Sequence, residues 1–343
     1  MASEFELEEY RKEIENIDKQ VIQLISKRLK IAAKIGQIKM KMGKDITDEK
    51  REEKIKQYWY EYARIFGIPE SFVDSVLPIL FSYSKLTQIS PGKKKNITII
   101  GYGGMARSLI SLFSLVGHNV VITGRNKEKA EKLASEFRYI YMDLDSAISW
   151  GEYIILALTP SSLDFIASIS PKFTNKVVMD IFSSKHKVFA QLEKLSETYL
   201  FSYVSTHPLF GPMLYPVGER IVIIPSKTSK NVDEIVNFWR ELGLNVIIST
   251  VDKHERAMAI VQVLAHLYIL ALSNAIKELK KELEIDNLQE FYTTNFREIS
   301  KVIDRVESLL PVIMEIQKSN PYAFKARDIG IKELQKIKDE LGD

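Results

Sequence analysis

The first residues that could do chemistry are cations set among aliphatic side chains near the N-terminus. Between Glu6 and Met42 the apolar residues repeat at roughly heptad spacing, with no proline and a single glycine, which predicts one long helix with an apolar seam. Arg28 lies in that seam, between Leu24 and Ile31, where a large aliphatic residue is expected. Because a buried guanidinium needs an anionic partner, Arg28 predicts a site for a small anion.

Two further cations on the same predicted helix extend this pattern. Lys39 follows Arg28 by eleven residues, close to three whole turns, so both point the same way. Arg11 precedes Arg28 by seventeen residues and is offset by roughly a quarter-turn, which suits a pocket shared with a second subunit. A helix on the order of 50 Å long cannot be covered by a small bundle alone, so its seam is expected to meet a partner chain.

More polar residues fall on the next two predicted helices. Asp48, Arg51 and Glu52 are spaced i, i+3, i+4 and share one face of a helix that starts after Gly43 and Lys44. A third helix carries Ser84 and Gln88 one turn apart. The alternative is an ordinary charged surface on a small bundle, since isolated pairs are usually that. Arg28 is the residue that this alternative explains worst.

The chain changes character at residue 96. Ile97–Ile100 reads as a buried strand, a glycine turn follows at once, and a helical pattern begins at Arg107. This is the context of a dinucleotide-binding turn, in which glycines permit the tight turn and the approach of a pyrophosphate to a helix N-terminus. The turn consists of Gly101, Tyr102, Gly103, Gly104, Met105 and Ala106.

The second predicted strand, Asn119–Thr123, indicates which cofactor is bound. At its end an NAD enzyme usually has an acidic residue for the ribose hydroxyl, whereas this chain has Arg125 and Asn126 after Gly124. A guanidinium there can pair with a 2′-phosphate, which favours NADP over NAD. If Arg125 only stacks on the adenine, NAD is acceptable.

Two later strands are expected to end at the nicotinamide. One is followed by Thr159 and Pro160, and the other by a turn that contains Ser183. His207 then precedes Pro208, which favours an extended conformation, and a loop rich in proline and glycine follows. A histidine just beyond the cofactor strands is a candidate general base.

The remainder from Asp252 is predicted to be helical. Ala257–Ile276 is apolar nearly all round, which indicates a helix in a core or a subunit interface rather than a membrane span. His254 and His266 fall on different faces, and His266 is the better candidate for a site. Later helical segments carry polar residues, namely Arg297, Arg305 and Asn320.

Length and composition limit the number of domains and the classes of function that the chain can have. The chain has 343 residues, which suggests two or three domains, and a net charge of +3, too balanced to indicate nucleic-acid binding. It has no cysteine, which excludes disulfides and thiolate metal sites, and no metal site is predicted. The polar, acidic N-terminus does not resemble a signal peptide, so the cytoplasm is the expected compartment. A polar linker from Ser90 to Asn96 divides a helical domain (1–92) from a dinucleotide-binding domain (93–250), and a helical substrate and dimerisation domain (251–343) follows.

Residues 5–90 resemble an all-helical chorismate mutase of the AroQ type, an intertwined dimer. The matching positions are Arg11, Arg28, Lys39, Asp48, Arg51, Glu52, Ser84 and Gln88. The resemblance implies rearrangement of chorismate to prephenate without a cofactor. Arginines would hold the two carboxylates, with Arg11 reaching in from the partner chain. Lys39 and Gln88 would donate to the ether oxygen, and Glu52 with Asp48 would hold the ring hydroxyl.

Residues 96 to about 325 resemble prephenate dehydrogenase of the TyrA family. The matching motifs are GYGGMA, DIFSSK, STHPLFGP and DKHERAMAIVQVLAH, and the order of the two parts resembles the bifunctional T-protein. The resemblance implies that His207 takes a proton from the substrate hydroxyl while hydride passes to the nicotinamide and carbon dioxide leaves. It assigns Ser183 to orientation and Arg305 to a substrate carboxylate.

The predicted architecture is therefore an all-α mutase bundle, a Rossmann-type α/β domain and an all-helical dimerisation domain in a homodimer without nucleic acid or membrane partners. Tyrosine as a feedback ligand stays open, as does prephenate against arogenate. The alternatives are an arogenate-using, imine-type or β-hydroxyacid-type dehydrogenase whose helical module only dimerises or senses a ligand. Those reductases usually have a lysine in the long helix, where this chain has Gln262 and His266.

Overall fold

The computed structural model describes residues 4–89 and 93–342, so part of the predicted linker, residues 90–92, lies outside the described chain. The chain forms two compact units. The first contains the residues up to Ala157 together with Pro208–Ile223 and Lys230–Ile247, and the second contains Leu158–His207, Ile224–Ser229 and the residues from Ile248 onward.

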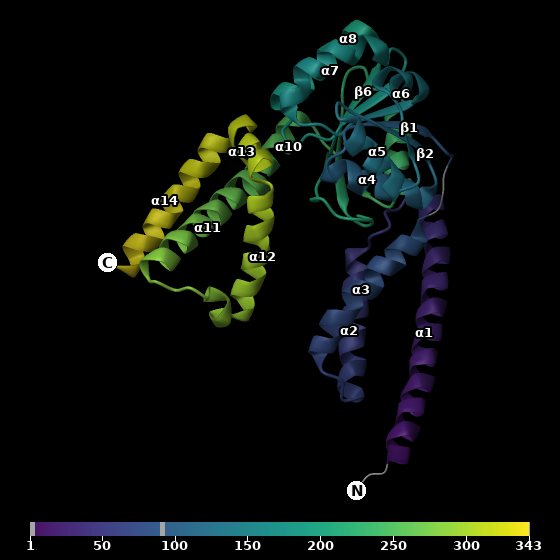
Figure 1. The fold of residues 1–343 in the computed structure, drawn as a ribbon, viewed down its shortest axis with the longest axis vertical. Coiled ribbons are helices and arrows are strands. Elements are labelled where there is room, and N and C mark those ends of the chain that lie inside the picture. Colours follow the sequence, from purple (N-terminus) through teal and green to yellow (C-terminus); the bar gives the residue numbers. More distant parts are fainter. Residues whose placement is uncertain (1–3, 90–92, 343) are drawn as a thin grey trace. The chain divides into compact units, whose positions relative to one another are not determined.

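The first unit begins with three helices, α1 (Glu4–Lys41), α2 (Glu49–Ile65) and α3 (Glu70–Gln88) (Figure 1). Asp48 caps α2, because its carboxylate accepts a hydrogen bond from the Arg51 backbone N–H at 3.0 Å. Pro69 immediately precedes α3. A small core of Ala63, Val73 and Leu77 joins α2 to α3.

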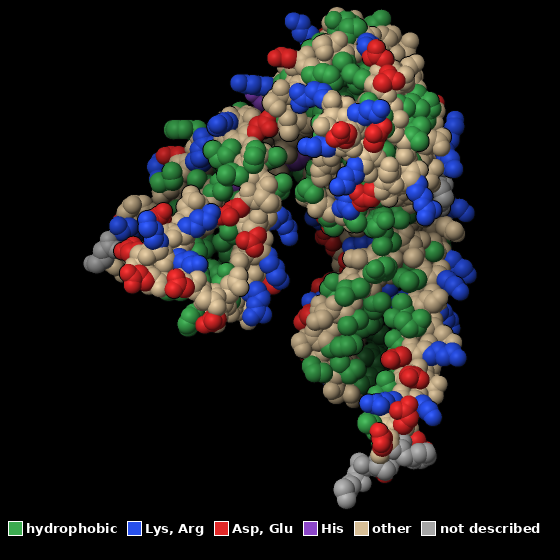
Figure 2. Space-filling model, viewed as in Figure 1, with side chains coloured by type: hydrophobic (Ala, Val, Ile, Leu, Met, Phe, Trp, Pro, Cys, Tyr) green, Lys and Arg blue, Asp and Glu red, His purple; other side chains and the backbone are tan. Residues whose placement is uncertain are grey.

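The apolar seam of α1 is largely exposed within one chain. Ile14 is 58% exposed and Leu24 is 66% exposed, although both are large aliphatic residues. Figure 1 shows that α1 runs well beyond α2 and α3, and Figure 2 shows hydrophobic side chains gathered on the visible face of this helical module. An uncovered stripe of this length supports the expectation that a partner chain covers it.

Beyond the helices, the first unit contains a parallel βα arrangement. Its elements are β1 (Asn96–Ile100), α4 (Gly104–Val116), β2 (Asn119–Thr123), α5 (Lys127–Glu136), β3 (Ile140–Tyr141), α6 (Leu144–Trp150) and β4 (Tyr153–Leu156). Ile99 of β1 lies opposite Ile122 on one side and Ile155 on the other, and all three are fully buried. Burial on both faces explains why these strands are continuous apolar runs.

Within residues 4–89 and 93–342, the strands follow the order β3-β2-β1-β4-β5-β6-β7-β8. After β4 the chain continues, in order, with η1 (Pro160–Ser162), α7 (Leu163–Ile169), η2 (Ser170–Phe173), β5 (Val177–Asp180), α8 (His186–Tyr199), β6 (Ser202–Pro208), β7 (Arg220–Pro225), α9 (Val232–Glu241) and β8 (Asn245–Ile248). In the second unit β5 and β6 are parallel, with Asp180 opposite Ser205. β4 and β5 are the two strands that the sequence predicted ahead of Thr159 and Ser183.

The second unit ends in a helical array. It comprises α10 (Val251–Met258), a π-helix (Ala259–Leu264), α11 (Ala265–Glu282), η4 (Leu288–Phe291), α12 (Thr294–Ser308), α13 (Leu310–Ser319) and α14 (Ala323–Leu341). The π-helix was not predicted. Val251–Glu282 is long and apolar enough to cross a membrane by length and composition, and 17% of its most apolar window is buried within the chain. This low burial favours the interface role expected for Ala257–Ile276 over a core role.

We expect the double substitution Ile14→Glu and Ile17→Glu to increase hydrogen exchange along residues 7–24. Both side chains are more than half exposed in one chain, so slow exchange in this segment requires that a partner chain cover it. Two glutamates buried in that interface would be costly enough to displace the partner. Hydrogen-exchange mass spectrometry measures this, with Lys19→Glu as the control outside the stripe. Fast exchange of this segment in the unsubstituted protein would contradict a partner on α1.

Candidate active sites

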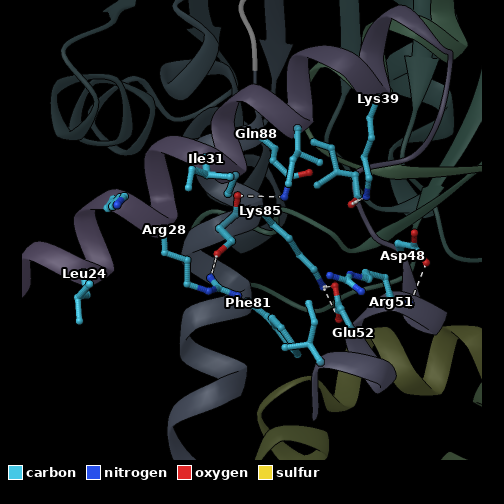
Figure 3. A pocket seen from close by; sticks show the side chains of 16 residues that line it. Leu24, Arg28, Ile31, Lys39, Asp48, Arg51, Glu52, Phe81, Lys85 and Gln88 are labelled. Atoms are coloured by element: carbon cyan, nitrogen blue, oxygen red, sulfur yellow. Dashed lines mark hydrogen bonds and ion pairs between the residues drawn. The ribbon is translucent and has the colours of Figure 1, made fainter. Parts of the chain in front are cut away.

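A cavity of about 540 Å³ opens among the three N-terminal helices. Figure 3 shows cationic and acidic side chains from α1, α2 and α3 pointing toward one another around it. Seven of the eight predicted mutase residues line this cavity, namely Arg28, Lys39, Asp48, Arg51, Glu52, Ser84 and Gln88. Arg11 does not line it: its side chain is 62% exposed and pairs with Glu8 at 3.4 Å.

Arg28 is held in the cavity by neutral groups. Its Nη1 donates to the Ser84 hydroxyl and to the Leu80 carbonyl at 3.3 Å, and the guanidinium lies 6.0 Å from the Phe81 ring centroid. Burial lowers the pKa of Arg28. Among the described residues no carboxylate pairs with Arg28, so the anion that its sequence position predicts must come from elsewhere.

Lys39 lies at the other end of the cavity. Its Nζ donates to the Ile46 carbonyl at 2.6 Å, which holds the ammonium near the start of α2. Burial lowers the pKa of Lys39 most, whereas the charges of Asp48 and Glu52 raise it and that of Lys85 lowers it. The ammonium is therefore influenced both by the acidic residues of the site and by a second cation.

Gln88 is buried where α1 and α3 approach most closely. A Cβ on Gly36 would lie 2.5 Å from the Gln88 Cβ, so the only glycine of α1 permits this contact. The Gln88 Nε2 donates to the Ser84 carbonyl at 3.2 Å, and its buried Oε1 has no partner. The amide nitrogen carries a second N–H, so it can donate to a ligand while its bond to Ser84 is kept.

The prediction missed Lys85, which also lines the cavity. Its Nζ lies 3.1 Å from Glu52 Oε1, and both side chains are mostly buried, at 17% and 27% exposed. The signal was present in the sequence, because Leu77, Phe81 and Lys85 are spaced i, i+4, i+8 and share the inward face of α3.

The glycine turn has the geometry that a pyrophosphate requires. Gly101 has φ +134°, and a Cβ there would lie 2.1 Å from the Ala157 carbonyl oxygen. A Cβ on Gly103 would meet nothing within 4 Å, and no side chain caps the start of α4, which leaves its first N–H groups available. Tyr102 packs over Gly124, with ring carbon Cε1 2.6 Å from where a Cβ would be.

The remaining cofactor candidates have different surroundings. Arg125 is exposed directly after β2, as a residue that contacts a ribose must be. Asn126 caps α5 by accepting from the Lys129 N–H at 2.8 Å, which explains its type without a cofactor. In the second unit, the Thr159 and Ser161 hydroxyls are 2.7 Å apart, and Pro160 begins a 3₁₀ turn.

His207 is buried at the end of β6, in a strand rather than a loop. Its Nδ1 lies 2.8 Å from Nε2 of His254, so one imidazole donates to the other. Burial lowers the pKa of His207 well below its usual range, and the nearby His254 and Lys185 add to the effect. The imidazole therefore stays neutral, and able to accept a proton, to a lower pH than an ordinary histidine.

Glu255 braces this pair of histidines. Its carboxylate accepts hydrogen bonds from the backbone N–H groups of Lys185 and His186, the latter at 3.2 Å. Its Oε1 also lies 3.6 Å from His254 Nδ1, and the Asn320 amide donates to its backbone carbonyl at 2.8 Å. His254 Nδ1 has no hydrogen-bond partner among the described residues, so Glu255 lies beside this ring without bonding to it. The contact of His254 with His207 is a role that the sequence left undecided.

A fully buried ion pair lies next to this arrangement. Lys185 Nζ donates to Asp180 at 2.6 Å and to the Thr206 carbonyl at 2.7 Å, and both charged side chains are 0% exposed. The Tyr203 hydroxyl donates to the other Asp180 oxygen at 2.7 Å. The network joins β5 to β6 and so positions the backbone on either side of His207.

The other predicted dehydrogenase residues are less enclosed. Ser183 is half-buried in the turn before α8, and Arg305 is exposed on α12. His266 is half-buried at the start of α11, where burial lowers its pKa and its buried Nδ1 has no partner. Gln262, on the π-helix, also has a buried oxygen without a partner.

Three family models match the chain in succession. Residues 10–89 match chorismate mutase type II, residues 96–184 match NADP oxidoreductase, coenzyme F420-dependent, and residues 250–343 match the prephenate dehydrogenase dimerization domain. The chain joins a chorismate mutase domain to prephenate dehydrogenase domains.

Two curated proteins are similar to most of this chain. A "Probable arogenate/prephenate dehydrogenase" of Methanocaldococcus jannaschii is 26% identical over 72% of this chain, and the match spans 57% of that relative. The T-protein of Haemophilus influenzae is 22% identical over 82% of this chain and 73% of its own length.

Two solved structures share the fold. Synechocystis arogenate dehydrogenase has a TM-score of 0.55 at 18% identity, over 70% of this chain and 90% of its own. Prephenate dehydrogenase from A. aeolicus, in complex with hydroxyphenyl propionate and NAD+, has a TM-score of 0.54 at 15% identity, over 72% and 92%. At these identities both likenesses concern the fold alone.

Asp180→Asn is expected to lower the free energy of unfolding by about 3–5 kcal/mol, because it leaves the Lys185 ammonium buried without its counter-charge. Urea denaturation measures this. Glu298→Gln is the matched control, since it removes a carboxylate from a pair with Lys301 in which both side chains are more than 60% exposed, and its midpoint should barely move. Equal midpoints for the two variants would contradict a structural role for the buried pair.

Proposed function

We propose that this protein rearranges chorismate to prephenate in the helical cavity and oxidises prephenate to 4-hydroxyphenylpyruvate in the dehydrogenase part. The observation that carries the proposal is Arg28, a cavity-lining guanidinium that no carboxylate among the described residues neutralises. We propose the domain bounds 1–92, 93–250 and 251–343, and a homodimer.

The mutase reaction needs a substrate held in a compact conformer. Chorismate has two carboxylates, and Arg28 offers a bidentate contact to one of them. As the ether C–O bond breaks and the new C–C bond forms, negative charge develops on the ether oxygen, and Lys39 with Gln88 would donate hydrogen bonds there. Glu52 would accept from the ring hydroxyl. No proton is transferred, so positioning and charge supply the catalysis.

Arg11 is proposed to act in the partner's cavity. It is exposed on the part of α1 whose apolar stripe is uncovered in one chain, and it does not line its own cavity. Asp48 already caps α2 and Arg51 is exposed at the cavity edge, so these two would close the site around the substrate rather than form its floor.

The dehydrogenase part fits a nicotinamide dinucleotide. The space that a Cβ at Gly101 would fill, the open surface over Gly103 and the uncapped N-terminus of α4 suit a pyrophosphate. Gly101, Tyr102, Gly103, Gly104 and Met105 would surround the phosphates, and Thr159 with Pro160 would approach the nicotinamide. A bound nicotinamide would accept the hydride.

Within the second unit, His207 is the proposed base. Its neutral imidazole would accept the proton of the substrate's ring hydroxyl as hydride leaves the same carbon and the ring loses carbon dioxide to become aromatic. His254 and Glu255 hold the ring in place for this step. Arg305 would bind a substrate carboxylate, with Ser183 and His266 contacting the substrate at its polar groups.

Two single substitutions should separate the two activities. Arg28→Leu is expected to reduce chorismate consumption by at least about a thousandfold while prephenate oxidation persists, and His207→Asn should do the reverse. Chorismate absorbance and reduced-cofactor fluorescence report the two reactions separately. If Arg28→Leu left chorismate turnover intact, or if His207→Asn oxidised prephenate normally, the corresponding assignment would be wrong.

Arg125 is proposed to favour NADP through the 2′-phosphate. Arg125→Asp should raise KM for NADP by about tenfold or more and lower KM for NAD, because the charge at the ribose is reversed. Lys129→Asp, on the following helix, makes the same change in charge away from the end of β2. If both variants changed KM for the two cofactors equally, the effect would come from the net charge of the protein and not from a contact of Arg125 with the 2′-phosphate.

A further inference from the structure

Lys85 links two helices across the helical cavity. It reaches from α3 to Glu52 on α2, as Figure 3 shows, with Nζ 3.1 Å from one carboxylate oxygen and 3.4 Å from the other. Glu52 is a carboxylate in a cavity proposed to take a dianion, and Lys85 is the cation that pairs with it directly. Lys85 offsets that charge and restricts how the carboxylate can turn.

The alkyl chain of Lys85 is confined by a residue from a distant part of the sequence. Gly218, between β6 and β7, has φ +86°, and a Cβ there would lie 2.6 Å from Lys85 Cδ and 3.1 Å from the Thr47 hydroxyl. Lys85 can therefore lie against this backbone only because residue 218 has no side chain.

Gly218 is itself held firmly. Its carbonyl accepts hydrogen bonds from the Asn245 amide at 2.7 Å and the Thr47 hydroxyl at 3.3 Å, and its N–H donates to the Gly243 carbonyl at 2.7 Å. Close by, Arg240 pairs with Asp45 at 3.2 Å. The dinucleotide-binding part thus supplies a rigid wall behind Lys85.

We propose that Lys85 is a positioning residue of the mutase site, which orients Glu52 toward the substrate hydroxyl, and that Gly218 of the dinucleotide-binding part fixes Lys85 for this task. The inference rests on the proposed mutase activity. It makes that site dependent on a backbone position outside the helical module, about 130 residues later in the chain than Lys85.

The first test uses Lys85 and Glu52 together in the full chain. Lys85→Met should lower kcat/KM for chorismate about tenfold, and Lys85→Arg should recover to within about threefold of the unsubstituted protein. In a Glu52→Gln background the Lys85→Met change should cost less than about twofold, because no carboxylate remains to be oriented. Prephenate oxidation by every variant reports whether the fold survives.

The outcomes distinguish this inference from the proposed function. If the unsubstituted chain does not consume chorismate, the proposed function fails. If that chain is active and Lys85→Met matches it, only the positioning role is overturned. The same holds if Lys85→Met costs as much in the Glu52→Gln background as it does when Glu52 is present.

The second test uses two glycines with similar backbones. Gly218→Ala and Gly117→Ala both strain a positive φ, +86° and +75°, but a Cβ on Gly117 would meet only Lys94 Cε, 4.0 Å away. Gly218→Ala should lower mutase kcat/KM about fivefold, and by much less in a Lys85→Met background, whereas Gly117→Ala should not lower it. Equal losses in the two alanine variants would mean that strain alone is responsible and that Gly218 does not act through Lys85.

Discussion

The helical site depends on the cost of a cation that lies among aliphatic side chains without a counter-ion. Arg28 is held by a hydroxyl, a carbonyl and an aromatic ring, none of which neutralises it. Such an arrangement is tolerated where a ligand supplies the missing charge. Three other features shape the same site. Gly36 allows α1 to approach α3, the Ile46 carbonyl holds Lys39, and a cavity is open among the three helices.

In the dehydrogenase part, buried charged side chains are stabilised by other groups of the protein. Asp180 and Lys185 neutralise each other, and two backbone N–H groups stabilise Glu255. His207 contacts His254 through one ring nitrogen of each, and burial lowers the pKa of His207. The two sites thus differ, since the helical cavity leaves the Arg28 cation for the substrate to neutralise, whereas the dehydrogenase part pairs the Lys185 cation with Asp180 and leaves His207 as a base.

Local chemistry made much of this predictable. Arg28 and Lys39 were found from helical spacing, the turn from Gly101 from its flanking strand and helix, and His207 from its place after the strands. Lys85 was missed although its spacing from Leu77 and Phe81 places it on the inward face of α3. Its contact with Gly218 could not be predicted, because it joins positions far apart in sequence and no local period records it. The π-helix at Ala259–Leu264 was missed because its apolar pattern reads as ordinary helix. The site assignments themselves remain predictions, as does the pairing of Arg125 with a 2′-phosphate.

The most direct measurement is a crystal structure of the protein grown with prephenate and without a nicotinamide cofactor. We predict ligand density among α1, α2 and α3, with a carboxylate within hydrogen-bond distance of the Arg28 guanidinium and the ring hydroxyl near Glu52. An empty helical cavity at saturating prephenate, with Arg28 turned out to solvent, would contradict the proposed mutase site.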